Sequence, residues 1–93
     1  MIRGFRDRRT AAFFAGRLVK DWRNIQRAAE RKLIYLDSAA ALTDLAAPPG
    51  NRLEKLKGDR AGQYSIRIND QWRICFVWKP DGAYSVEITD YHG

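Results

Sequence analysis

The chain changes its hydrophobic period at Pro48-Pro49-Gly50, and this change constrains the fold more than any other feature of its 93 residues. Before this stretch, apolar residues recur at steps of three and four, which is typical of amphipathic helices. After it, apolar and polar residues alternate, which is typical of strands with one buried face. Because proline cannot donate to a helical ladder, the stretch ends the helical half. We therefore expect an α+β fold, with helices first and a sheet second.

The first half predicts a short strand followed by helices. Residues 1–5, MIRGF, are a candidate strand, and residues 10–18 form a short helix with Thr10 as its N-cap. Asp21 is the expected N-cap of a long helix, and a further helical stretch over residues 38–47 follows or continues it. The apolar residues on one face of the long helix are Trp22, Ile25, Ala29, Leu33, Leu36 and Ala40.

The second half predicts strands joined by short turns. The alternating stretches are residues 52–57, 64–69, 72–78 and 84–89. The sequence Pro-Asp-Gly at residues 80–82 is a strong turn signal, and short turns give an antiparallel meander. The residues expected on its buried face are Tyr64, Ile66, Ile68, Trp72, Ile74, Phe76, Trp78, Tyr84, Val86 and Ile88. We expect one domain over residues 1–93, with N-terminal helices packed on one face of a mainly antiparallel sheet of about four to five strands.

Charge and composition narrow the classes of function. A net charge of +6 and a pI of about 9.9 favour polyanions, an anionic membrane surface or an acidic partner. Cys75 is the only cysteine, so we expect a packing residue and no intrachain disulfide. Without paired carboxylates or His/Cys clusters at useful spacing, we expect no metal and no cofactor. The N-terminus has no apolar run typical of a signal peptide or membrane span, so we expect a soluble, cytoplasmic protein that does not bind membranes.

The last residues carry the groups best suited to proton transfer. His92, the only histidine, follows Asp90 and Tyr91 after the last predicted strand. Val86 and Ile88 anchor this strand, and by alternation Asp90 and His92 continue its buried face. RNA cleavage by the 2′-hydroxyl requires a base, an acid and positive charge on the phosphorane oxygens. Histidine and tyrosine suit proton handling, and arginine suits phosphate, so no metal is required.

The stretch LKGDRAGQYSIRINDQWRICFVW of residues 56–78, together with the terminal DYH, resembles the HigB group of the RelE-type bacterial toxins. The order of elements fits over nearly the whole chain, and MIRGF resembles the opening strand of the family. The resemblance implies a RelE-like fold and a toxin of a type II toxin–antitoxin system. It implies a ribosome-dependent endoribonuclease that cuts mRNA in the A site. The implied partners are the 30S ribosomal subunit, mRNA, and a helix-turn-helix (HigA-like) antitoxin, through which alone it would meet operator DNA.

The same resemblance assigns site residues position by position. Residues 90–92 match the active site, and Lys57 and Arg73 match basic positions that contact the RNA phosphate. Glu54 stands where better-known members have a histidine, three residues before the lysine. A glutamate can act as a general base but never as a cation, which implies a slower toxin. The further RNA contacts expected on the sheet are Arg60 and Arg67.

A second basic surface is predicted on the long helix, opposite its apolar face. This basic stripe comprises Lys20, Arg23, Arg27 and Arg31, which step by three or four residues. It is either a solvated helix face or a contact with ribosomal RNA. Ile34 falls within the stripe, and we expect it to pack on another helix or on the antitoxin.

Two other classes of function fit the sequence. A non-catalytic basic domain that binds RNA or the ribosome would share the charge without needing the terminal DYH. A small protein-interaction domain would use the basic face only for a protein partner. A helix-turn-helix repressor does not fit, because most of the second half is predicted to be strand.

Overall fold

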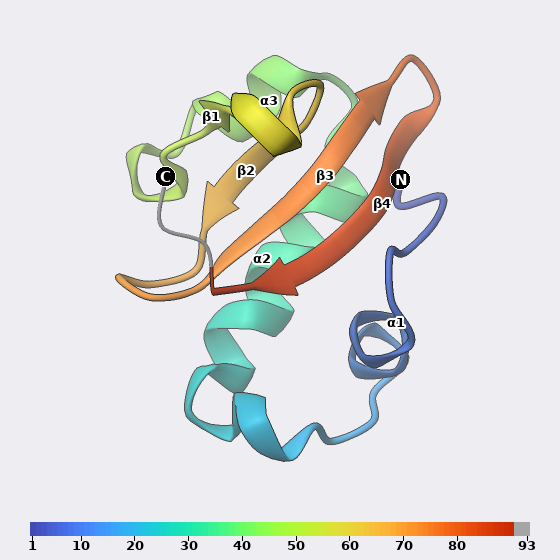
Figure 1. Cartoon of the computed structure of the whole chain (residues 1–93), viewed down its shortest axis with the longest axis vertical. Coiled ribbons are helices and arrows are strands. Elements are labelled where there is room, and N and C mark those ends of the chain that lie inside the picture. Colours follow the sequence, from blue (N-terminus) through green and yellow to red (C-terminus); the bar gives the residue numbers. More distant parts are fainter. Residues whose placement is uncertain (91–93) are drawn as a thin grey trace.

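The computed structural model describes residues 1–90, which form helices packed against a four-stranded antiparallel sheet of order β1-β2-β3-β4 (Figure 1). The strands are β1 Glu54–Lys55, β2 Tyr64–Arg67, β3 Arg73–Lys79 and β4 Gly82–Thr89. The helices are α1 Arg8–Phe14, α2 Gln26–Ser38 and α3 Leu42–Ala46, and the 3₁₀ turns are η1 Lys20–Ile25, η2 Pro49–Asn51 and η3 Gly58–Arg60. The predicted α+β architecture is confirmed.

The core lies between α2 and the inner face of the sheet, which is the face that the helices cover (Figure 1). Ile66 of β2 and Ile74 and Phe76 of β3 are fully buried, and they belong to the same apolar cluster as Leu33 and Leu36 of α2. Burying a side chain of this size stabilises a fold by about 1.5–3 kcal/mol. The alternation predicted for β2 and β3 is therefore confirmed.

The prediction that Thr10 caps the first helix is wrong. Asp7 is the N-cap of α1, and its Oδ1 accepts a hydrogen bond of 2.6 Å from the backbone N–H of Thr10. Asp7 has extended backbone angles and a carboxylate that reaches the first helical turn, so the helix begins three residues earlier than expected. The buried hydroxyl of Thr10 instead accepts the backbone N–H of Ile88 at 3.2 Å, which joins α1 to β4.

The prediction that Asp21 starts the long helix is also wrong. Residues 20–25 form η1, and α2 begins at Gln26 without a side-chain cap. In a 3₁₀ turn, side chains three residues apart eclipse, and this brings both Trp22 and Ile25 into the core. Ala40, expected on the buried face, is exposed because α2 ends at Ser38.

Tyr84 lies on the outer face of the sheet, although simple alternation placed it in the core. The pairing shifts between Cys75 and Val77, so that one extra residue of β4 is accommodated in a β-bulge. Ser85 occupies the bulge with a φ of +52°. Because the bulge inverts the alternation, Ala83 rather than Tyr84 joins the core.

The N-terminal segment, predicted as a short strand, lies beside β4 but is not a strand of the sheet. It forms two isolated parallel bridges, Ile2 to Ala83 and Phe5 to Val86, rather than a continuous strand. Gly82 has a φ of +141°, and a Cβ atom there would lie 2.1 Å from the carbonyl oxygen of Met1. Only glycine therefore allows this close approach of the chain start to the β3–β4 turn.

Asn51 joins the helical half to the sheet half. It is fully buried, its Nδ2 donates to the carbonyl of Leu45 at 3.1 Å, and its Oδ1 accepts from Nζ of Lys32. Burial, followed by the charge of nearby arginines, lowers the pKa of Lys32. The next residue, Arg52, adopts left-handed backbone angles and directs the chain towards β1.

Asn51→Ala should lower the free energy of unfolding by about 1–3 kcal/mol, because it leaves a buried carbonyl and an amine without their partner. The matched control is Asn24→Ala, since Asn24 is exposed and its loss should change stability by less than about 0.5 kcal/mol. Urea denaturation of both variants measures the difference. Equal stability of the two would contradict the role given to Asn51.

Candidate functional site

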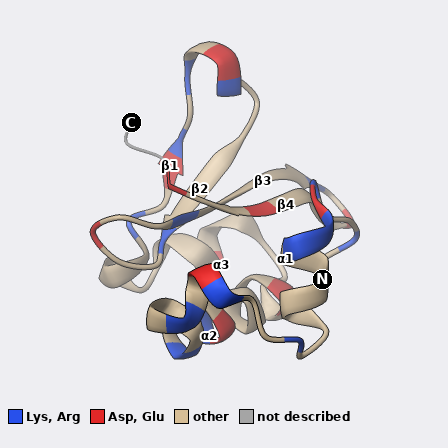
Figure 2. Ribbon diagram, turned by 60° about the horizontal axis from the view of Figure 1, so that its bottom comes forward, with Lys and Arg blue, Asp and Glu red and all other residues tan. Residues whose placement is uncertain are grey.

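The outer face of the sheet, opposite the helices, holds most of the predicted site residues. Side chains directly across a β-ladder share a face, so the pairing defines two rows. The first row is Glu54, Ser65, Cys75 and Glu87, and the second is Arg67, Arg73 and Thr89. Figure 2 shows that the β1–β2 connection, which carries Lys57 and Arg60, rises from the sheet on the side away from α2. The outer face and this connection together form the candidate site.

Arg73 is held in place by two neutral oxygen atoms. Its Nε donates to Oγ of Ser65 at 2.7 Å, and its Nη2 donates to the carbonyl of Arg52 at 2.8 Å. Ser65 is fully buried, and Arg52 has a φ of +44°. The guanidinium is therefore fixed on the outer face without an acidic partner among the described residues, and its positive charge remains available to an anion.

Arg60 also lies at the site, but unlike Arg73 it has a carboxylate partner. Its Nη1 donates to Oε1 of Glu87 at 2.6 Å and to Oε1 of Gln63 at 3.1 Å. Arg6 lies 3.7 Å from the other oxygen of Glu87. Arg60 thus ties the β1–β2 connection to β4, and its charge is already opposed by a carboxylate.

Arg67 pairs across the ladder with Arg73, so two cations stand side by side at the start of β3. Arg67 Nη2 donates to the carboxylate of Asp70 in the β2–β3 turn. Asp70 is almost fully exposed, so solvent screens this ion pair. Glu54 and Lys57 are both exposed, on β1 and at the start of the connection.

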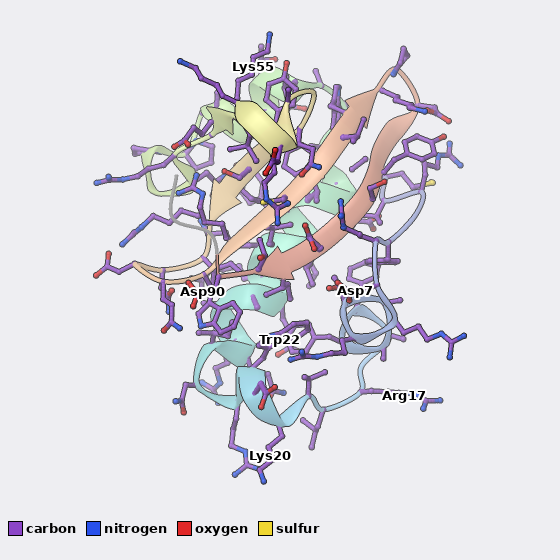
Figure 3. All side chains as sticks on the ribbon, in the orientation of Figure 1. Asp7, Arg17, Lys20, Trp22, Lys55 and Asp90 are labelled. Carbon is purple, nitrogen blue, oxygen red and sulfur yellow. The ribbon has the colours of Figure 1, made fainter. Side chains whose placement is uncertain are left out.

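Asp90 follows β4 directly and lies at the edge of the sheet (Figure 3). Its Oδ2 accepts from Nε2 of Gln71 at 3.1 Å, which joins the end of β4 to the β2–β3 turn. The preceding residue, Thr89, pairs with Arg73, so the chain leaves the sheet beside the second row of the site. The other two residues of the predicted terminal site, Tyr91 and His92, lie outside the described residues.

The basic stripe of Lys20, Arg23, Arg27 and Arg31 is exposed, and the last three line one shallow groove. The stripe lies on η1 and α2, which cover the inner face, so the structure does not bring it together with Arg73. Figure 3 shows Lys20 at the opposite end of the molecule from Lys55 of β1. The side chain of Ile34 is 60% exposed, so packing within the described residues does not cover it.

The sequence reasoning missed Ser65 and the backbone of Arg52 as parts of the site. Ser65 has the pattern of an ordinary outward residue of a strand, and a backbone carbonyl leaves no trace in residue types. The one usable signal was the Pro-Pro-Gly stretch shortly before Arg52, which marks an irregular turn. Their role became visible only through the hydrogen bonds to Arg73.

Cys75 is fully buried in the first row, as expected of a packing residue. Burial raises the pKa of its thiol to about 11, because the thiolate would lose its hydration. At neutral pH the residue is therefore a protonated thiol with no access to solvent, and it is unsuited to act as a nucleophile.

Cys75 should resist a thiol-specific disulfide reagent at pH 8 in the folded protein. The thiolate fraction is small below a pKa of about 11, and burial blocks the reagent. In urea the thiol should react quickly, because an unfolded cysteine has a pKa of about 8.5. Absorbance of the released chromophore gives both rates, and equally fast labelling in both states would contradict the burial.

Within residues 1–90, no group of three His, Cys, Asp or Glu side chains could hold a metal ion. Within the same residues, no helix has the length and hydropathy that crossing a bilayer requires.

Known proteins of one toxin family are similar in sequence to this chain. The family model described as the RelE-like toxin of type II toxin-antitoxin system HigB matches residues 3–92. Toxin HigB-1 of Vibrio cholerae serotype O1 is 51% identical over 69 residues, which cover 74% of this chain and 72% of that protein. Endoribonuclease HigB of Proteus vulgaris is 44% identical over 41 residues, which cover 44% of this chain and 45% of that protein.

A solved structure, the YoeB–YefM complex from Staphylococcus aureus, has a similar fold. The similarity covers 100% of this chain and 99% of that chain, with a TM-score of 0.60. At 18% sequence identity, the likeness concerns the fold alone, and it agrees with the α+β architecture described above.

Proposed function

The chain belongs to the family of RelE-like HigB toxins of type II toxin–antitoxin systems, and we propose that it is an endoribonuclease that stops translation by cutting mRNA in the ribosomal A site. The observation that carries this proposal is that neutral oxygen atoms hold the guanidinium of Arg73 in place. An immobilised guanidinium with no acidic partner among the described residues stands on the one sheet face that the helices leave open. Such a group suits a phosphate that gains negative charge during the reaction.

The proposed reaction is attack by the 2′-hydroxyl of the RNA on the adjacent phosphorus. The 2′-oxygen loses its proton to a base, the bond from phosphorus to the 5′-oxygen breaks, and an acid protonates that oxygen. The products are a 2′,3′-cyclic phosphate and a 5′-hydroxyl end. In this proposal Arg73 and Lys57 stabilise the phosphorane oxygens, and Glu54, Asp90, Tyr91 and His92 are the candidates for proton transfer.

Arg60 and Arg67 would contribute to RNA binding in a more limited way. Each already donates to a carboxylate, of Glu87 and Asp70 respectively. A phosphate would have to compete with that carboxylate. These two arginines would therefore add positive electrostatic potential to the RNA-binding surface rather than bind one phosphate oxygen tightly.

Ribosome dependence follows from the small number of proton-transfer groups on this surface. The A site would hold the RNA in line for attack, and such positioning alone can supply several orders of magnitude in rate. The basic stripe on η1 and α2 faces away from the outer face, and it would contact ribosomal RNA while the sheet meets the message. The 30S subunit and mRNA are the proposed partners.

The family implies an antitoxin as the protein partner. We propose that it has a helix-turn-helix fold and that this chain meets operator DNA only through it. Ile34 and Tyr35, which are 60% and 39% exposed, line a groove between α2 and α3 and supply apolar surface that a protein partner could cover.

Purified protein should cut mRNA on translating ribosomes much faster than naked RNA, and Arg73→Ala should reduce the ribosomal rate on the order of 100-fold or more. The matched control is Arg17→Ala, an exposed arginine outside both basic surfaces, which should keep the full rate. Mapping of new 5′ ends on the message measures cleavage, and thermal melting verifies that each variant folds.

Three results would count against the proposal. Equal rates with and without ribosomes would remove the ribosome dependence. An Arg73→Ala variant with the full rate would remove Arg73 from the reaction. RNA binding by the unmutated protein without any cleavage would favour the non-catalytic RNA-binding domain instead.

Deletion of residues 91–93 should abolish growth inhibition with little change in melting temperature. The buried contacts of Val86 and Ile88 remain, while positioned acid–base groups typically contribute about 10²–10⁴-fold in rate. His92→Gln should weaken the toxin rather than abolish it, because Lys57 and Arg73 would still stabilise charge. Growth after induction is the measurement, and a truncated protein that folds and still arrests growth would exclude Tyr91 and His92 from catalysis.

A further inference from the structure

We propose that Ser65 and the backbone carbonyl of Arg52 are positioning groups that fix the orientation of Arg73 so that its Nη1 group meets the RNA phosphate. This inference rests on the proposed function of Arg73. It adds two groups that touch no substrate and that act through the guanidinium.

A guanidinium has two edges that can bind an oxyanion through two parallel hydrogen bonds. The side edge presents Nε–H together with one N–H of Nη2, and the end edge presents Nη1 together with the other N–H of Nη2. In this protein Oγ of Ser65 accepts a hydrogen bond from Nε at 2.7 Å, and the carbonyl of Arg52 accepts one from Nη2 at 2.8 Å. Nη1 donates to no acceptor among the described residues, so it is the part of the guanidinium left for a phosphate.

The two acceptors are themselves rigid. Ser65 is fully buried within β2, in the ladder position beside the Arg67–Arg73 pair. Arg52 has a φ of +44°, a left-handed conformation that a non-glycine residue adopts only with strain. The buried Asn51 next to it holds the chain there through its bonds to Leu45 and Lys32. A strained backbone conformation beside a candidate site is typical of groups that must be held in one geometry.

The neutrality of both acceptors distinguishes Arg73 from the other paired arginines. Arg60 and Arg67 donate to carboxylates, and the further ion pairs in the described residues involve Arg3, Arg6 and Arg9. A carboxylate would hold a guanidinium but would cancel its charge towards a second anion. A hydroxyl and a carbonyl fix the same geometry and leave the full positive charge, which is what electrostatic stabilisation of a phosphorane requires.

Ser65→Ala should reduce the single-turnover rate of cleavage on ribosomes on the order of tenfold, with little change in binding to the ribosome. The same substitution should have no further effect in an Arg73→Ala background, because Ser65 acts only through that side chain. The matched control is Thr10→Val, which also removes a buried hydroxyl hydrogen bond but far from Arg73. Its stability should fall, and any effect on the rate should be the same in both backgrounds.

An unchanged rate in Ser65→Ala, or an equal loss with and without Arg73, would overturn the proposal. A second measurement does not depend on cleavage. Solvent exchange of the Arg73 Nε–H, measured by NMR, should be slower than that of the exposed Arg17, and Ser65→Ala should abolish the difference. Equal exchange at both arginines in the unmutated protein would overturn the proposal even if the protein cleaves RNA. If the unmutated protein binds RNA without cleaving it, the proposed function fails, and the NMR result decides the positioning of Arg73 separately.

Discussion

The antiparallel pairing of β2 with β3 is the constraint on which both the core and the candidate site depend. It places Ile66 opposite Ile74 on the inner face and Arg67 opposite Arg73 on the outer face. Because side chains alternate with a period of two, a slip of one residue would expose the core and bury two cations. Burial of the apolar residues therefore also fixes where the arginines stand, and the stability of the sheet positions the site.

The sequence predicted the layers of the fold because hydrophobic period is a property of residue types alone. The strands β2 and β3 and the buried face of α2 follow from it directly. The start of α1 did not follow, because Asp7 and Thr10 are both good caps and only the backbone angles decide between them. Tyr84 was misplaced because a bulge adds a residue that alternation cannot anticipate. Ser65 was missed because its importance depends on a neighbouring strand and not on its own segment.

The arginines of this basic protein serve different physical purposes. Arg60 is neutralised by Glu87 and fastens the β1–β2 connection to the sheet. Arg73 is held by neutral oxygens and keeps its charge. The basic stripe on η1 and α2 lies on the other side of the molecule, exposed to solvent. The net charge of +6 is thus divided between two separate surfaces, one built around a fixed cation and one made of exposed side chains.

The central claim is that the outer face of the sheet, organised around Arg73, is the surface that receives the RNA. The most direct measurement is an NMR titration with a short RNA whose 2′-O-methyl groups prevent cleavage. We expect the largest amide shifts in β2, β3 and the β1–β2 connection, and we expect Arg73→Ala to weaken them. Shifts confined to η1 and α2, where the basic stripe lies, would mean that the RNA binds the opposite side of the molecule, and the outer face would then not be the RNA surface.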